Sequence, residues 1–331
     1  MLGNDPIGIR PLPILTITAV ISVLGCYFFT LAAPAQRAQS QQFTVPLHAT
    51  IDQTVATLAS GGFIKNPTAF RVIQELRGPI RAGGFTISRS MNAWQIAGAL
   101  TGEPVMVWVV IPEGLRKEEI AGILAQDLGW DASTTARWIT TDTTTQYDYT
   151  EGVYFPDTYL IPRTESPAAV AQRLQAKFRE VFAPYASEAL AQNIRWPTVL
   201  RIASIVQREA AGTSDMPLIA GIIWNRLLKG MPLDIDATIQ YARGNTGNGW
   251  WAPIAPADKK IDSPYNTYLH AGLPPHPISD PGLAAIDATL NPAQTDCLYY
   301  LHDAAHQIHC SATYAEHQRN IATYLSGTAT K

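Results

Sequence analysis

Charge is scarce in this sequence. Only 15% of its 331 side chains are charged, and 24 Lys and Arg stand against 27 Asp and Glu; an average soluble domain carries roughly 25% charged residues. Because 47% of the residues are hydrophobic, the chain can build one large or two ordinary cores and is not a disordered polyelectrolyte. Nucleic-acid-binding proteins usually carry a basic excess that neutralises phosphates. We therefore expect no nucleic-acid partner.

The sequence also lacks the signals of several common sites. Three cysteines are too few for a disulfide-dense miniprotein or a four-cysteine zinc module. There is no glycine-rich phosphate loop, no His-Glu-x-x-His and no Gly-x-Ser-x-Gly, which removes the commonest nucleotide, zinc-protease and serine-hydrolase sites. Four histidines gather near the C-terminus at spacings that fit no standard ligand set: His302, His306, His309 and His317. We expect neither a metal ion nor a cofactor.

One long hydrophobic run is present near the N-terminus. Residues 12–33 carry no formal charge over 22 positions, and as a helix they would cover roughly 33 Å, enough for a bilayer core. The run predicts a transmembrane helix, with residues 1–11 as a short cytoplasmic tail, residues 34–42 as a linker and the body exported. A cleaved signal peptide is the alternative, because Ala33-Pro34-Ala35 has the small-residue pattern of a cleavage site.

An exported body would permit a disulfide. Cys26 lies inside the hydrophobic run, whereas Cys297 and Cys310 flank two short β-like runs around a turn at residues 303–305. A hairpin centred near residues 303–304 would place these two cysteines opposite each other, within disulfide range. Two buried free thiols are the alternative.

The body begins with two small mixed modules and ends with a helix-rich half. Apolar spacing and cap residues predict helices at residues 51–61, 67–77, 91–100, 116–128, 167–185 and 198–211, another helix after Ser214 or Asp215, and strands near residues 85–87 and 105–111. A polar, threonine-rich stretch at residues 133–150 separates the modules from the C-terminal half.

The expected helix at residues 198–211 carries a candidate acid. Glu209 shares a face with Ile202, Ile205 and Val206, because these positions follow the i, i+3, i+4, i+7 spacing. A carboxyl held on an apolar face is desolvated, which raises its pKa and keeps it protonated near neutral pH, as a general acid requires. The alternative is a glutamate that pairs with an arginine or sits at a frayed helix end.

Two further features suit either a ligand or a structural role. The run Leu233-Asp234-Ile235-Asp236 alternates, so both aspartates point to one face. They could bind a cation or form a glycosidase-like pair, or Asp236 could cap the short helix that follows. Trp250 and Trp251 stand in a loop rich in Gly, Asn and Pro, where their indoles could stack on sugar rings or anchor the loop.

A series of ordered motifs covers residues 151–325. The motifs are Glu151-Gly152-Val153-Tyr154-Phe155-Pro156-Asp157-Thr158-Tyr159, Ala203-Ser204-Ile205-Val206-Gln207-Arg208-Glu209-Ala210, Asn225-Arg226-Leu227, Gly230-Met231-Pro232-Leu233, Asp236-Ala237-Thr238-Ile239-Gln240-Tyr241, Ser263-Pro264-Tyr265-Asn266-Thr267-Tyr268, Gly272-Leu273-Pro274-Pro275 and Glu316-His317. Together they resemble the membrane-anchored endolytic murein transglycosylases, the YceG-like family. Residues 45–130 match more weakly, through Gly83-Gly84-Phe85 and Ile111-Pro112-Glu113-Gly114.

This resemblance implies an α+β fold in several parts. A single N-terminal transmembrane helix would lead to small LysM-like α/β modules at residues 43–150, a mixed α+β catalytic domain at residues 151–326 and a tail at residues 327–331. Four positions depart from the family pattern: Asp234 stands for a usual Gln, Ala237 for Pro, Gln207 for an acidic residue and Cys310 for an aromatic residue. None of these departures removes Glu209.

The resemblance also implies endolytic cleavage of peptidoglycan. Glu209 would protonate the oxygen of the β-1,4 bond between N-acetylmuramic acid and N-acetylglucosamine. It would then take the proton of the muramoyl C6 hydroxyl as that oxygen closes onto C1, leaving a 1,6-anhydro end. One carboxyl serves first as acid and then as base, so a second carboxylate is not obligatory. We expect Asn225, Asp236, Tyr265 and Asn266 to position the substrate and Glu209.

The expected partners are peptidoglycan glycan strands, the bacterial membrane through the N-terminal helix, and cell-wall synthesis enzymes whose nascent strands would be trimmed or terminated. The expected location is the bacterial cytoplasmic (inner) membrane, crossed once, with the catalytic domain on the outer, periplasmic side. Two other readings stay open. One is a glycoside hydrolase in which Asp234 or Asp236 activates water, and the other is a non-catalytic glycan-binding scaffold in which Glu209 is merely buried.

Overall fold

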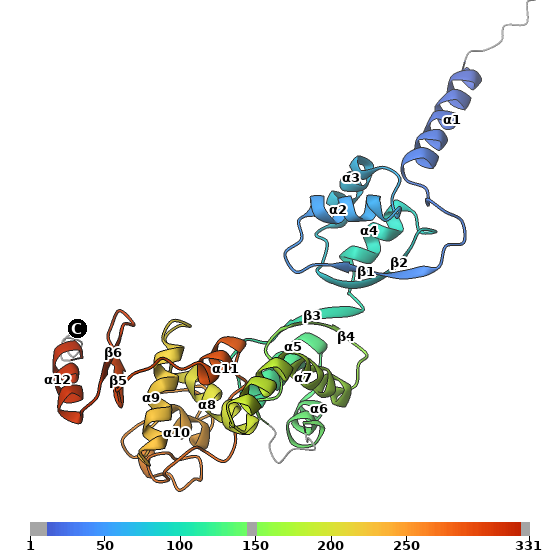
Figure 1. Cartoon of the computed structure of the whole chain (residues 1–331). Coiled ribbons are helices and arrows are strands. Elements are labelled where there is room, and N and C mark those ends of the chain that lie inside the picture. Colours follow the sequence, from blue (N-terminus) through green and yellow to red (C-terminus); the bar gives the residue numbers. More distant parts are fainter. Residues whose placement is uncertain (1–11, 144–150, 326–331) are drawn as a thin grey trace, which may run out of the picture. The chain divides into compact units, whose positions relative to one another are not determined.

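The computed structural model describes residues 12–143 and 151–325, which form two compact units (Figure 1). The first unit holds the residues up to Trp108 together with Leu160–Thr164, and the second holds the remainder. The mixed α+β class is confirmed.

The division between the units differs from the predicted boundary at residue 150. Residues 109–143 belong to the second unit, so the second of the two expected modules does not stand by itself. The predicted tails, residues 1–11 and 327–331, lie outside the described residues.

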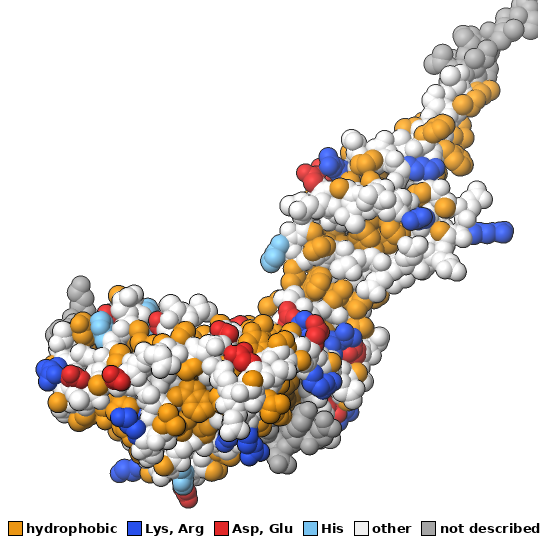
Figure 2. All heavy atoms as spheres, viewed as in Figure 1, with side chains coloured by type: hydrophobic (Ala, Val, Ile, Leu, Met, Phe, Trp, Pro, Cys, Tyr) orange, Lys and Arg blue, Asp and Glu red, His pale blue; other side chains and the backbone are white. Residues whose placement is uncertain are grey.

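Helix α1 (Leu12–Thr30) precedes the first sheet strand. Hydrophobic side chains lie along its surface (Figure 2), and Ile21, Val23 and Phe29 are among the exposed ones. Within the described residues, no helix combines the length and the apolar character needed to cross a membrane. A span at residues 12–33 therefore stays a prediction.

The first unit folds around its own apolar core. Its elements are β1 (Ser40–Val45), α2 (Ile51–Ser60), α3 (Pro67–Arg77), β2 (Gly83–Ser88) and α4 (Ala93–Thr101). Capping boxes start α2 at Thr50 and α4 at Asn92, while Asn66 caps α3 ahead of Pro67. The three helices predicted here are confirmed. Their buried faces meet in a cluster that includes Leu58, Phe70, Ile73, Ile87, Ile96 and Leu100.

A four-stranded sheet with the order β1-β2-β3-β4 includes β3 (Met106–Val110) and β4 (Thr158–Pro162). β1 and β2 are antiparallel, with Phe43 opposite Phe85. Gly84 pairs with Met106, where an added Cβ atom would lie 2.9 Å from the Met106 Cβ atom. A residue without a side chain is therefore needed for β3 to approach β2 at this point.

The second unit is largely helical. Its helices are α5 (Lys117–Leu128), α6 (Ala132–Arg137), the π-helical turn η1 (Trp138–Asp142), α7 (Pro167–Ala191), α8 (Trp196–Glu209), α9 (Met216–Leu228), α10 (Asp236–Arg243), the 3-10 turn η2 (Asp258–Lys260) and α11 (Leu283–Leu290). The expectation of a polar spacer at residues 133–150 is wrong for residues 133–143, which are mostly helical. Trp138 is fully buried there and packs on Tyr154 with 5.5 Å between ring centroids. Residues 144–150 lie outside the described residues.

Helix α8 is the centre of this unit, since it packs against α7, α9, α10 and α11 (Figure 1). Pro197 occupies its first turn, where a missing N–H is tolerated. Its apolar side chains, Ile202, Ile205 and Val206 among them, are fully buried. The face predicted for Glu209 is thus the buried face of the helix.

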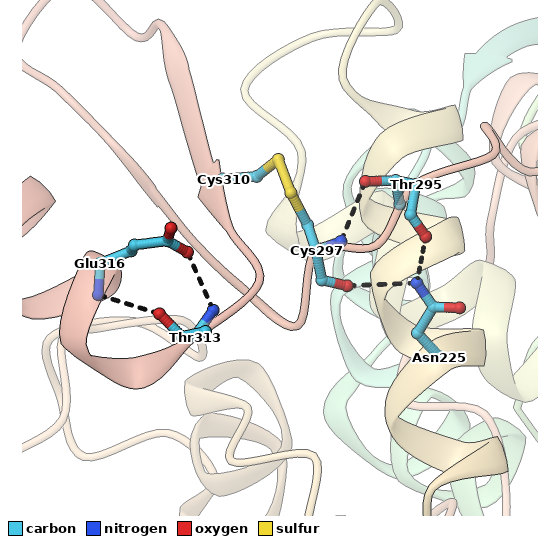
Figure 3. The surroundings of a disulfide bond; sticks show 6 residues. All are labelled: Asn225, Thr295, Cys297, Cys310, Thr313 and Glu316. Atoms are coloured by element: carbon cyan, nitrogen blue, oxygen red, sulfur yellow. Dashed lines mark hydrogen bonds between the residues drawn. A yellow bond between two sulfur atoms is a disulfide. The ribbon is translucent and has the colours of Figure 1, made fainter.

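A hairpin and a last helix complete the second unit: β5 (Tyr299–His302), β6 (Ile308–Ser311) and α12 (Tyr314–Tyr324). The sequence left Cys297 and Cys310 open between a disulfide and two free thiols, and the structure shows the disulfide, with the two Cα atoms 5.8 Å apart (Figure 3). The predicted register is wrong, because Cys310 pairs with Tyr300 and not with Cys297. Cys297 precedes β5, so the disulfide ties the strand's entry to its partner strand.

Candidate active site

A cavity of about 550 Å³ lies at the C-terminal end of α8, within the second unit. This volume falls in the range of roughly 300–1,000 Å³ that small-ligand sites occupy. The cavity is lined by Glu209, Arg226, Leu233, Asp234, Ile235, Asp236, Lys259, Tyr268, Tyr299, Tyr300, Tyr314 and His317. Charged and aromatic side chains from several elements therefore converge on the helix end that carries Glu209.

Glu209 is the last residue of α8, and the chain turns to an extended conformation at Ala210 (φ −73°, ψ 136°). Burial raises the pKa of the Glu209 carboxyl, and the charge of Asp236 raises it further. Hydrogen bonds from the Tyr300 hydroxyl and the Ala237 backbone N–H, together with His302, oppose that rise. The net direction is upward, as the apolar face of the helix predicted.

Both arginines of α8 donate to backbone carbonyls. Arg201 donates to the carbonyl of Pro274, and Arg208 donates to the carbonyl of Gly114 at 3.2 Å. The Glu209 Oε2 atom instead accepts a hydrogen bond from the Tyr300 hydroxyl at 2.6 Å. An arginine beside the carboxyl would lower its pKa strongly. A neutral hydroxyl donor lowers the pKa less, so the rise caused by burial remains.

Asp234 and Asp236 both line the cavity, as their alternation predicted. Asp234 adopts a left-handed backbone conformation (φ +52°), and its Oδ2 atom accepts from the Arg226 guanidinium at 2.6 Å. The expected capping role of Asp236 is wrong. Ile235 is the N-cap residue of α10, and the Asp236 carboxylate accepts a 2.6 Å hydrogen bond from the Tyr268 hydroxyl and lies 3.9 Å from Lys259 Nζ.

Asn225 and Asn266 lie outside the Glu209 cavity and hold loops that reach it. The side-chain amide of Asn225 donates to the carbonyls of Thr295 (2.7 Å) and Cys297 (3.2 Å), as Figure 3 shows. That of Asn266, which is fully buried, donates to two carbonyls of the segment at residues 259–261, while its oxygen accepts from the Tyr268 N–H. These contacts support the loops, and a role in positioning the substrate stays a prediction.

Tyr265 also lies outside this cavity. Its ring packs on Tyr241 with 4.7 Å between centroids, and burial raises the pKa of the Tyr265 hydroxyl to about 12. Of the five residues predicted for the site, the structure therefore brings Glu209 and Asp236 together in one cavity. The substrate roles of the other three stay predictions.

The paired tryptophans anchor their loop. The Trp251 indole donates to Glu119 Oε2 at 2.8 Å and packs under the Arg208 guanidinium, 3.9 Å from the ring centroid. The Arg116 guanidinium lies over Trp250 at 4.3 Å. Of the two roles that the sequence left open, loop anchoring is the one these contacts support.

Residues 43–323 match the model of the YceG-like family. The chain belongs to this family. It is 28% identical over 319 residues to a protein of Streptococcus pneumoniae named endolytic murein transglycosylase, with 85% of this chain and 58% of the relative covered. A protein of the same name from Bacillus subtilis is 27% identical over 308 residues, with 85% and 84% covered.

A solved structure agrees with the family assignment. The crystal structure of a YceG-like protein from Listeria monocytogenes is similar with a TM-score of 0.59 at 28% identity, and the match covers 85% of this chain and 98% of that one. The resemblance drawn from the motifs is thus confirmed. The chain spans somewhat more than half the length of the Streptococcus relative.

Two buried carboxyls of this YceG-like chain lie apart from the Glu209 cavity. Glu151 is 2% exposed and accepts from the Lys117 N–H (2.8 Å) and the Tyr241 hydroxyl (3.1 Å). Asp280 is fully buried and accepts from the Tyr154 N–H at 2.6 Å. Burial, aided for Glu151 by the negative charge of Asp280, raises the pKa of both carboxyls, that of Asp280 to about 8.

The sequence assigned no role to Tyr300 or Lys259, although both line the Glu209 cavity. Strand alternation carried a partial signal, because it places Tyr300 and His302 on the same side of β5. His302 in fact lies in the second unit against Asp215, with 3.1 Å between His302 Nε2 and Asp215 Oδ2. No sequence spacing links Tyr300 to Glu209, which stands 91 positions earlier.

Proposed function

We propose that this protein is an endolytic lytic transglycosylase that cuts the β-1,4 bond between N-acetylmuramic acid and N-acetylglucosamine within peptidoglycan strands. Membership of the YceG-like family and relatives named endolytic murein transglycosylases support this proposal. The observation that carries it is the Glu209 carboxyl, which ends a buried helix, opens to a cavity and has a raised pKa.

In the proposed reaction Glu209 begins protonated. It gives its proton to the glycosidic oxygen as the bond to C1 breaks, and the carboxylate that results accepts a hydrogen bond from Tyr300. The carboxylate then removes the proton of the C6 hydroxyl, whose oxygen bonds to C1 and closes the 1,6-anhydro ring. The proton returns to Glu209, so no water enters the products and the catalyst is regenerated.

Asp236 has a defined place in this scheme. A second negative charge near Glu209 raises the pKa of the acid, and it would stabilise the positive charge that develops on C1 in an oxocarbenium-like transition state. Asn225 and Asn266 contribute through the loops that they hold, which carry the hairpin and Tyr268 to the cavity.

The test is the Glu209→Gln substitution, which keeps the shape of the side chain and removes the titrating proton. We expect the release of 1,6-anhydro ends from purified glycan strands to fall by at least about 100-fold, the scale of general acid–base catalysis. Glu180→Gln, on the exposed side of α7, is the matched control and should cut at the native rate. Native release of anhydro ends by Glu209→Gln would refute the mechanism.

Hydrolysis is the second candidate, because Asp236 lines the same cavity as Glu209 and could activate water. The two reactions differ in product mass, since hydrolysis adds one water to each new reducing end. A mass spectrum of the ends made by the wild-type protein decides between them. Reducing ends that carry the added water would favour the hydrolase.

We also propose that residues 12–33 hold the protein in a bacterial cytoplasmic membrane, with the body on the outer side beside the enzymes that synthesise the wall. The uncharged run and the exposed apolar side chains of α1 support this location, and so does the disulfide, which suits an oxidising compartment. The first unit would then bind glycan as a LysM-like module. Membrane fractionation tests the anchor, which fails if deleting residues 1–35 leaves the protein in the membrane fraction.

A further inference from the structure

The Glu209 carboxyl is held by one strand of the C-terminal hairpin. Tyr300, in the middle of β5, donates its hydroxyl proton to Glu209 Oε2 at 2.6 Å. The tyrosine is half-buried at the cavity wall, and the pKa of its hydroxyl is raised well above the usual range by desolvation and by the neighbouring Glu209. Tyr300 therefore acts as a neutral hydrogen-bond donor throughout the pH range in which Glu209 titrates.

The strand that carries Tyr300 is tied down on both sides. Cys310 is the register partner of Tyr300, and its sulfur is bonded to that of Cys297 (Figure 3). Asn225 on α9 holds the carbonyls of Thr295 and Cys297. The side-chain amide of Asn225 thus holds the chain just before β5. The disulfide links that segment to Cys310, which lies opposite Tyr300 on β6.

Two backbone contacts also hold the start of the hairpin. The Leu298 N–H donates to the Ser311 carbonyl at 2.9 Å, and the Arg226 guanidinium donates to the Leu298 carbonyl at 3.3 Å. A two-stranded hairpin is only marginally stable by itself. A covalent tie between its strands therefore restricts where Tyr300 can point.

We propose that Tyr300 is a positioning residue for Glu209, and that the Cys297–Cys310 disulfide maintains this contact and so makes cleavage sensitive to thiol reductants. The inference rests on the proposed function for its catalytic consequence. Its structural content, the hold of Tyr300 on the Glu209 carboxyl, can be measured without any substrate.

The hydrogen bond has two physical effects. It occupies Oε2 as an acceptor, which favours the acidic proton on the other oxygen, Oε1. It also stabilises the carboxylate that forms as the proton leaves, which lowers the pKa of Glu209 against the effect of burial. The other charged or titratable groups around the carboxyl and its cavity are Asp234, Asp236, Arg208, Arg226, Lys259, Tyr268, Tyr299, His302, Tyr314 and His317.

The first experiment compares Tyr300→Phe with the wild-type full chain. We expect the rate at saturating glycan strands to fall about 10- to 100-fold, the scale of a lost hydrogen bond to a charged group. Because the lost bond had lowered the pKa of Glu209, the high-pH limb of the rate profile should move to higher pH. A merely structural role would lower the amount of folded protein without moving that limb.

Tyr324→Phe is the matched control for this change. Tyr324 stacks on His309 of the same hairpin, with 3.6 Å between ring centroids, but it does not line the cavity. The control should keep both the native rate and the native pH limb. A Tyr300→Phe protein that also keeps both would overturn the proposal.

The second experiment breaks the disulfide. We expect dithiothreitol treatment of the wild type, and the double substitution Cys297→Ser with Cys310→Ser, to lower the rate and to move the pH limb in the same direction as Tyr300→Phe. Adding Tyr300→Phe to the double substitution should change little further, because the contact is already lost. Cys26→Ser removes a free thiol and keeps the disulfide, so it should behave as the wild type. Unchanged rate and pH limb after reduction would overturn the role of the disulfide.

A readout without substrate separates this inference from the proposed function. In protein labelled with ¹³C at glutamate carboxyls, the Glu209 resonance, assigned by its loss in Glu209→Gln, should titrate at a higher pH in Tyr300→Phe than in the wild type. That shift would support the inference even if no glycan were cut, in which case the proposed function alone would fail. An unchanged titration would reject the positioning role whatever the activity.

Discussion

Burial raises the pKa of three carboxyls in two different settings, one at a cavity and one inside the second unit. Glu209 faces a cavity and can exchange its proton with a ligand, whereas Glu151 and Asp280 are closed off inside the second unit. Two anions cannot remain charged side by side in a dry interior, so one of the closed pair holds a proton near neutral pH. The charges of Glu118 and Arg116 also act on Glu151, the first raising and the second lowering its pKa.

This buried pair predicts a pH dependence of stability. A carboxyl whose pKa is raised on folding stabilises the fold below its unfolded value, and this contribution is lost as pH rises through the folded value. For Asp280 that window runs from the usual 3.8 to about 8. We expect the free energy of unfolding to fall across this window by up to about 1.4 kcal/mol per pH unit for each proton involved.

Asp280→Asn is the variant that tests this dependence, because it keeps the shape and removes the titration. Urea unfolding at pH 5, 7 and 9 should give a smaller loss of stability with pH in Asp280→Asn than in the wild type. Asp262→Asn, at an exposed position, is the control and should keep the wild-type slope. Equal slopes for the wild type and Asp280→Asn would contradict the assignment.

At this scale the sequence predicted that Glu209 lies on a buried helix face, and only part of what surrounds it. Glu209 could be found because helical spacing places it on the face of Ile202, Ile205 and Val206, and that information is local. The contacts of Asn225 and Asn266 could not be predicted, because a side-chain amide in a polar motif can hydrogen-bond either to a ligand or to a backbone carbonyl. Which of these it meets depends on loops that fold against it from elsewhere in the chain.

Among the elements, the contact between α9 and the segment that follows α11 shows how the hairpin is supported. An added Cβ atom at Gly221 would lie 2.4 Å from the carbonyl oxygen of Ala293, and the Ala293 N–H donates to the Pro217 carbonyl at 2.9 Å. The backbone of this segment therefore lies directly on α9. It leads to Thr295 and Cys297, which Asn225 holds one turn further along the same helix.

Gly221→Ala should disturb this support. The methyl group would meet a backbone atom that cannot rotate away, so we expect a loss of about 1–3 kcal/mol in the free energy of unfolding, the usual cost of overpacking. We also expect slower cleavage, because the displaced segment leads into the hairpin that carries Tyr300. Thermal unfolding and the rate of anhydro-end release are the measurements.

Gly122→Ala is the matched control for this substitution. Gly122 also lies within a helix, α5, but its added Cβ atom would meet nothing within 4 Å. Alanine is the better helix former by about 1 kcal/mol, so this variant should be as stable as the wild type or more so. Similar destabilisation at the two positions would mean that the close approach of Gly221 to Ala293 does not contribute to the loss of stability.

Local signals decided how well the elements could be predicted. Capping boxes and glycines fixed the helices of the first unit to within a few residues. The hairpin register was missed because alternation does not specify turn length. Here the turn is held by the Asp303 carboxylate, which accepts from the N–H groups of Ala305 and Gln307, and His306 adopts a φ of +59°.

For the whole molecule, the sheet explains why the division into units differs from the boundary predicted at residue 150. β3 and β4 each begin in one unit and end in the other, so no polar linker marks the division. Composition highlights stretches such as residues 133–150, where threonines are frequent, but Trp138 within it is a core residue. A boundary inside a strand leaves no compositional signal.

Separate cores predict that the two units can be destabilised separately. Phe70 is fully buried in the first unit, on α3. Phe70→Ala removes a whole ring from this core, which typically costs about 3–5 kcal/mol. We expect hydrogen exchange followed by mass spectrometry to show lost protection in peptides from α2 to α4, with native protection retained in peptides from α8 and α9.

Leu76→Ala on the same helix is the control, because Leu76 is 73% exposed and its truncation leaves no cavity. It should preserve protection throughout the described chain. If Phe70→Ala exposed α8 to exchange as strongly as α3, the units would unfold as one cooperative body. Retained protection of α8, together with anhydro-end release at the native rate, would instead place both stability and chemistry of the Glu209 site within the second unit.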